Sequence, residues 1–154
     1  MFQLLVFGHI VLVFSAVSAS YGPLLLLALA IRSGKVETVR GVTAAAGPLT
    51  KTIPILYVAG GFLGLCAAIN IGFNLLAPWL LIAYVLFAFL TIIGAAFVGP
   101  WAERIGALAA SAPDGQFTPK LIAVIDDSRI RSIRVLDFAL VVALVFDMVV
   151  KPFS

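Results

Sequence analysis

Three ionisable side chains, His9, Asp137 and Asp147, stand inside long apolar stretches of this 154-residue chain. Ionisable groups are expensive in such surroundings and are therefore candidates for function. At a helical rise of about 1.5 Å per residue, His9 and Asp147 lie about 12 Å and about 10 Å from the two chain ends. Asn70 and Asn74 fall in a turn expected at the same end. A His–Asp pair there can hold a proton, orient the imidazole or grip a ligand.

A structural interpretation of the same side chains needs only partners within the chain. Asp147 and Lys151 are four residues apart, the spacing of a local ion pair on one helix. Asp137 follows Arg134 closely, and we expect a structural ion pair between them. His9 is able to hydrogen-bond a serine or a carbonyl group of a neighbouring helix.

Templates for catalysis and for cofactor binding do not fit this composition. The chain has one histidine and one cysteine, so a single copy cannot supply bis-histidine haem ligation or the usual zinc and copper ligand spacings. Glycines such as Gly60 and Gly61 fall inside an apolar run and not between a strand and a helix, which excludes a phosphate loop. We therefore expect no enzyme activity, no metal site and no cofactor.

The elements that position these residues are predicted to be membrane helices. Hydrophobic residues make up 63% of the chain and charged residues 11%, far from the proportions of soluble domains. We expect an all-α fold, an integral membrane antiparallel four-helix bundle forming a single domain over 1–154. The predicted spans are 2–31, 53–74, 78–99 and 133–151, joined by cytoplasmic loops 32–52 and 100–134. The third span is expected to stop at Gly99-Pro100.

The distribution of cations predicts the orientation of this bundle. Nine of the ten Lys and Arg residues fall in the two predicted loops, which the positive-inside rule assigns to the cytoplasm. Both termini and the turn near residues 70–78 are then on the outer, periplasmic side. Anionic lipid head groups are the expected partners of the basic loops, and nucleic acid is not. Close helix packing is expected at small residues such as Gly60 and Gly64.

Short motifs add a resemblance to a known family. These are His9 early in the first span, Gly99-Pro100 before a basic segment, and the ending from Leu136-Asp137 to Asp147-Met148-Val149-Val150-Lys151-Pro152. Together they resemble a family of small bacterial integral membrane proteins of unknown function, distantly similar to the membrane part of copper-resistance proteins. The resemblance implies a four-helix fold in the bacterial inner (cytoplasmic) membrane.

These observations leave more than one function open. The first hypothesis is a non-catalytic accessory or structural subunit that packs against a larger respiratory or photosynthetic membrane complex, because small-residue helix faces suit lateral packing. The alternative is a small membrane protein that handles protons, metal ions or a solute through His9 and Asp147. A weaker third possibility is a redox protein in which His9 ligates a haem shared with another chain.

Overall fold

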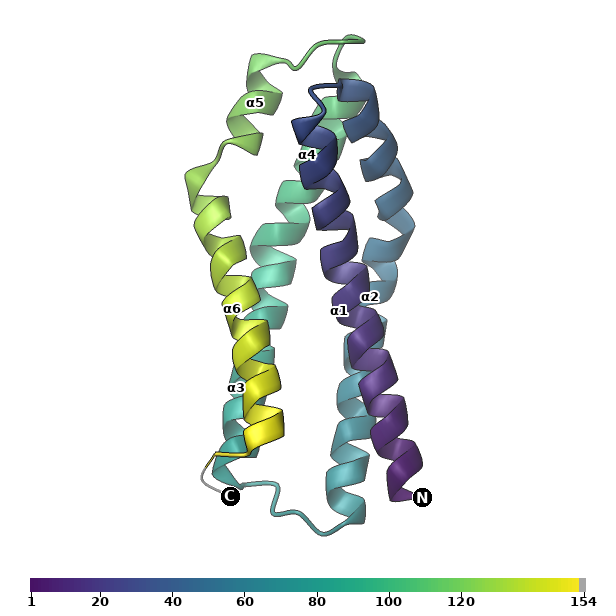
Figure 1. The fold of residues 1–154 in the computed structure, drawn as a ribbon, viewed down its shortest axis with the longest axis vertical. Coiled ribbons are helices and arrows are strands. Elements are labelled where there is room, and N and C mark those ends of the chain that lie inside the picture. The colour runs from purple at the N-terminus through teal and green to yellow at the C-terminus, as the bar shows by residue number, and fades with distance from the viewer. Residues whose placement is uncertain (153–154) are drawn as a thin grey trace.

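The computed structural model describes residues 1–152, and every element in that part of the chain is helical. Helix α1 spans Phe2–Arg32 and helix α2 spans Val36–Asn70. The reversal between them is tight, with Gly34 at a φ of 70°, a conformation that glycine adopts without strain. The two helices pack side by side and antiparallel (Figure 1).

The predicted loop 32–52 is mostly helix, because α2 already begins at Val36. Val36 and Val39 are fully buried in this segment, and their burial in the apolar core helps to hold it in a regular helix. The helix that covers most of the predicted span 53–74 therefore begins well before that span.

The third rod also continues further than predicted. Helix α3 (Pro78–Ile93) passes through a π-helical turn, η1 (Gly94–Val98), directly into helix α4 (Gly99–Ser111). The backbone N–H of Gly99 donates to the carbonyl of Gly94, five residues earlier. This wider turn leaves room for the ring of Pro100 and tolerates the absence of its N–H. The helix therefore continues through the proline.

The predicted loop 100–134 is replaced by α4, helix α5 (Pro119–Ile125) and the start of helix α6 (Ser128–Val150). Asp127 separates α5 from α6, because its carboxylate accepts a hydrogen bond from the Arg129 N–H at 2.9 Å and caps the new helix.

The all-α, four-rod architecture predicted from the sequence is confirmed. Three rods in the described part of the chain are long and apolar enough to cross a membrane: Phe2–Arg32, Val36–Asn70 and Pro78–Ser111. The fourth predicted crossing, 133–151, falls on α6, which carries Arg134, Asp137 and Asp147 there. That crossing stays a prediction.

The rods run alternately up and down (Figure 1). Helix α3 packs along α6, and α2 packs along α4. The start of α1, the end of α6 and the turn 71–77 lie at one end of the molecule, and α5 lies at the other (Figure 1).

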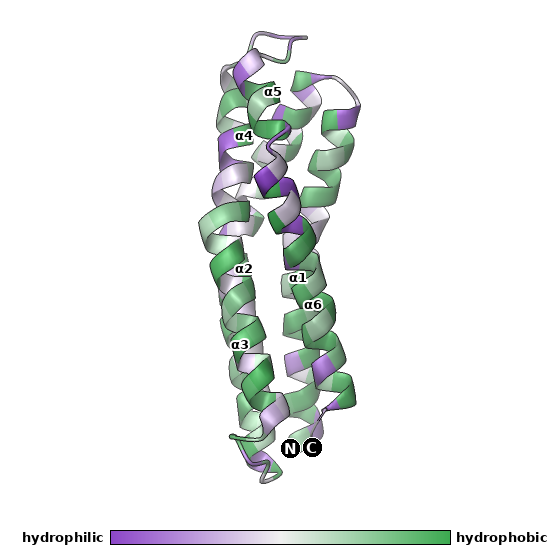
Figure 2. Ribbon diagram, turned by 90° about the vertical axis from the view of Figure 1, so that its left-hand side faces the viewer, coloured by the Kyte–Doolittle hydropathy of each residue, from purple (hydrophilic) through white to green (hydrophobic). Residues whose placement is uncertain are grey.

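The main apolar core lies at the α5 end of the molecule. We call this end, built from the end of α1, the start of α2, α4 and α5, the head, and we call the remaining length the shaft. Polar residues gather at the head, whereas most of the shaft is apolar (Figure 2). Apolar burial stabilises helices where water surrounds them, but not where lipid does. The core comprises Leu27, Ala30, Val36, Val39, Trp101, Ile105, Ala109, Ala112 and Leu121.

Candidate functional site

His9 is part of the contact between α1 and α2. Its Nδ1 lies 2.7 Å from the carbonyl oxygen of Gly60, and because a carbonyl only accepts, Nδ1 is the donor. A Cβ placed on Gly64 would lie 2.7 Å from the same nitrogen, and one on Gly60 would lie 2.9 Å from Val13 Cγ2. The predicted Gly60–Gly64 packing pair is confirmed: the imidazole fills the space at Gly64, and Val13 and Leu12 fill the space at Gly60.

Asp147 lies elsewhere, near the C-terminal end of α6. Its side chain is only 3% exposed, and neither carboxylate oxygen has a hydrogen-bond partner among residues 1–152. The structure therefore does not join Asp147 to His9, whose ring is bonded to α2.

The predicted ion pair between Asp147 and Lys151 is wrong. The Lys151 ammonium lies over the rings of Phe73 and Trp79, at 5.0 Å and 5.3 Å from their centroids. Lys151 is also the C-cap of α6 in a left-handed conformation, which turns its side chain off the helix. Cation–π attraction to these two rings replaces the expected carboxylate.

The two asparagines of the expected polar cluster belong to the turn after α2. Asn70 is the last, exposed residue of α2. Asn74 accepts a hydrogen bond from the Leu76 N–H at 3.0 Å through its side-chain oxygen, the geometry of an Asx turn. The turn structure accounts for Asn74, and neither asparagine is hydrogen-bonded to His9 or Asp147.

The predicted ion pair between Asp137 and Arg134 is also wrong. The Tyr21 hydroxyl of α1 donates to the Asp137 carboxylate at 2.5 Å, and the Tyr21 ring meets Phe138 edge-on at 6.1 Å. Arg134 stacks on Trp101, with its guanidinium carbon 4.9 Å from the ring centroid. A tyrosine 116 positions away in sequence gives no local signal, so sequence reasoning missed this partner.

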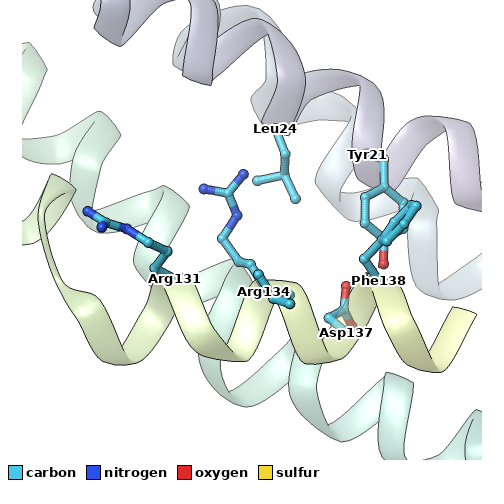
Figure 3. Close-up of a pocket in the computed structure, with 7 residues that line it drawn as sticks. Tyr21, Leu24, Arg131, Arg134, Asp137 and Phe138 are labelled. Carbon is cyan, nitrogen blue, oxygen red and sulfur yellow. Dashed lines mark hydrogen bonds between the residues drawn. The ribbon is translucent and has the colours of Figure 1, made fainter.

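These side chains line an open pocket between α1 and α6, where the shaft meets the head. We call it the α1–α6 groove; its volume is about 420 Å³. Figure 3 shows the Arg131 and Arg134 side chains toward one end of it and the Tyr21–Asp137 pair toward the other. It combines two cations, one hydrogen-bonded carboxylate and an apolar wall. The lining residues are Tyr21, Leu24, Arg131, Arg134, Val135, Asp137 and Phe138.

A second polar cluster, at the end of α4, holds the head together. The Arg40 guanidinium of α2 donates to the carbonyls of Ala109 and Ala112 at 3.2 Å and 2.9 Å. It also pairs with the Asp114 carboxylate at 3.0 Å. Arg40 therefore caps two carbonyls at the C-terminal end of α4 from another helix.

Glu37 completes this cluster, which we call the head clasp. Its carboxylate accepts a hydrogen bond from the Gly115 N–H at 2.5 Å. Gly115 has a φ of 73°, which a residue with a Cβ adopts only with strain. Hydrogen bonds from its own backbone N–H and from Gly115 lower the pKa of the Glu37 carboxyl. The clasp joins residues 69 to 78 positions apart, so it was not predicted from the sequence.

Within residues 1–152 no three His, Cys, Asp or Glu side chains converge in a way that would hold a metal ion. Comparisons with protein-family models, with curated proteins and with solved structures find no match to this chain. The geometry of the chain itself is therefore the basis for its proposed function.

Proposed function

We propose that this chain is a non-catalytic integral membrane protein that serves as an accessory subunit, packing laterally against a larger membrane complex. The observation that carries the proposal is the outer surface of the α1–α2 hairpin. Large apolar side chains such as Phe14 and Phe62 point outward there. Gly22 and Gly61 lie among them, with open space where a Cβ would stand. Small outward residues on apolar helices permit close approach of another helix.

The proposed topology follows from the charges and the fold together. All nine basic residues of the two charged stretches belong to the head end or to the parts of the rods next to it. The positive-inside rule then puts the head in the cytoplasm and both termini with the turn 71–77 outside. In a bacterium this outer side is the periplasm, and the host membrane is the inner membrane. A respiratory or photosynthetic assembly is the partner complex that we propose.

The alternative use of His9 and Asp147 as a joint site finds no support in the geometry. The His9 ring is bonded to Gly60 at 2.7 Å and packed against Gly64. Asp147 is buried on α6. The two residues therefore lie on different helices, and neither of them lines the α1–α6 groove.

Site-specific photo-crosslinking in living cells tests the proposed docking surface. A benzophenone side chain at Phe62, which is 63% exposed on α2, is expected to give a discrete adduct with another membrane protein. The matched control places it at Val142, an exposed position on α6, where adducts with lipid alone are expected. Gly61→Leu should abolish the Phe62 adduct by removing the close approach. Adducts with lipid alone at both positions would contradict the proposal.

A further inference from the structure

We infer that the α1–α6 groove holds one anionic phospholipid, with its phosphate bound by Arg131 and Arg134. This inference is independent of the partner complex proposed above, since it concerns a lipid site on this chain alone. The groove is lined by residues from the second half of α1 and the first half of α6, next to the polar α5 end of the molecule. In a bilayer, the boundary between the apolar shaft and the polar head is the level at which lipid phosphates lie.

The two arginines are placed to act on one phosphate. They are three residues apart on α6, so they share a face and are separated by about 4.5 Å along the axis. Both line the groove. The Arg134 side chain extends toward α1 beside Leu24, and the Arg131 side chain extends along α6 away from Asp137 (Figure 3). Arginine binds phosphate through two parallel N–H donors, which gives geometric specificity as well as charge attraction.

Neither guanidinium is neutralised within the described part of the chain. The ion pair found there joins Arg40 to Asp114, in the head clasp. Arg134 stacks on Trp101, which orients the guanidinium plane and leaves the N–H groups at its edge available for an anion. Arg131 is exposed. The nearby carboxylate of Asp137 already accepts the Tyr21 hydroxyl.

The remaining wall of the groove suits an acyl chain. Val135 and Phe138 are 67% and 59% exposed, and Leu24 faces them from α1 (Figure 3). The one anionic side chain of the groove, Asp137, lies on the shaft side of both arginines by about 4.5 Å or more of helix. Its charge repels a phosphate from that end. The lipid is therefore oriented with its phosphate toward the head and its chain along the shaft.

Native mass spectrometry of the full chain in mild detergent tests this site. The delipidated protein is titrated with phosphatidylglycerol and, separately, with phosphatidylcholine of the same chains. The first is expected to bind as a single retained molecule. The double variant R131Q/R134Q is expected to bind it roughly 30-fold more weakly, at about fivefold per arginine.

The matched control is R104Q/R129Q, which removes one arginine of α4 and one of α6, both outside the groove, and changes the net charge equally. It should bind phosphatidylglycerol like the wild type. Circular dichroism checks that each variant is folded, and the exposed single variant R131Q, with the expected fivefold loss, replaces the double variant if that unfolds.

Three results would overturn the inference. Equal losses in both double variants would mean attraction by net charge alone. Equal binding of phosphatidylcholine and phosphatidylglycerol would mean a merely apolar groove. Displacement of the lipid by excess inorganic phosphate, with phosphate bound in its place, would assign the arginines to a free anion. The accessory-subunit proposal is unaffected by any of these results, because its readout is a protein adduct at Phe62.

Discussion

Replacement of Arg40 by Met should open the head without disturbing the shaft. The change keeps an apolar stem of similar length and removes the guanidinium. Three contacts are lost: hydrogen bonds to the carbonyls of Ala109 and Ala112 at 3.2 Å and 2.9 Å, and the ion pair with Asp114 at 3.0 Å. The last carbonyls of α4 are then left without this cap.

The size of the effect follows from how exposed each contact is. A hydrogen bond from a charged donor contributes about 1.5–3 kcal/mol when buried. The Arg40 side chain is 35% exposed, so the two carbonyl bonds together are expected to contribute about 2–3 kcal/mol. The Asp114 side chain is 84% exposed, and such a surface pair adds less than about 1 kcal/mol. A loss of about 2–3 kcal/mol raises the population of the opened segment roughly 30- to 150-fold.

Hydrogen–deuterium exchange of the detergent-solubilised protein measures this opening. Amides of residues 110–116 should exchange roughly 30- to 150-fold faster in Arg40→Met, because their exchange rate follows the population of the opened segment. Amides in the α3–α6 contact should keep their wild-type rates. Asp114→Asn is the matched control, since it removes only the exposed pair and should change exchange several-fold at most. Wild-type rates in Arg40→Met, or an equal effect of Asp114→Asn, would refute the assignment of Arg40 as the cap of α4.

Three further predictions concern the shaft and the clasp. Gly64→Leu should separate α1 from α2, because even its Cβ would lie 2.7 Å from the His9 ring. We expect the free energy of unfolding, measured by thermal unfolding, to fall by about 1–3 kcal/mol. Gly61→Leu should change it little, because there is open space at Gly61. The pKa of the Glu37 carboxyl is lowered in the folded protein. Its contribution to stability is therefore present above the pKa that it has in the unfolded chain, and it is lost as the pH falls through the pKa of the folded protein. The exchange rate of the Gly115 amide, normalised for intrinsic exchange, should therefore rise below about pH 4.5, and Glu37→Gln should remove that dependence. Asp147→Leu should raise the unfolding temperature, because it removes two buried oxygens that have no hydrogen-bond partner among residues 1–152. The free energy of unfolding should rise by about 1–3 kcal/mol; a lower unfolding temperature would show that the carboxylate has a partner in the membrane.

The apolar runs of the sequence were sufficient to predict the rods of the shaft. Each run is long and uncharged, and a backbone without water as a partner must satisfy its hydrogen bonds within a helix. The Gly60–Gly64 seam was also predictable, because small residues four apart lie on one helix face. The structure adds the identity of the side chains that meet them, Val13 and Leu12 at Gly60 and His9 at Gly64.

The head was predicted poorly because its order depends on contacts that are distant in sequence. Charged residues near 32–52 and 100–134 predicted that these stretches lie outside the membrane, but they did not indicate that Val36 and Ile105 are fully buried there. A composition-based argument does not reveal which face of a charged helix is covered. Similarly, Pro100 is a stop signal in an α-helix, but the π-turn before it allows the rod to continue.

For the polar residues, the depth along the helix was predictable from the sequence, but the direction of the side chain was not. Helical rise predicts how far His9 and Asp147 lie from the chain ends, but not toward which neighbour each side chain turns. Helix rotation decides that question, and it depends on the packing of whole helices. The local ion-pair rule failed for Asp137 because Tyr21 of another helix is a nearer partner, and for Lys151 because two aromatic rings lie beside it.

Purification of this chain from its native membrane in mild detergent, followed by weighing of the intact assembly, tests whether the chain is an accessory subunit. We expect a particle well above the 16.2 kDa of the chain, containing other membrane proteins in fixed proportion. We also expect Gly61→Leu to reduce the recovery of these proteins and Val142→Leu to leave it unchanged. A lone 16.2 kDa species, accompanied only by lipid, would contradict the proposal of an accessory subunit.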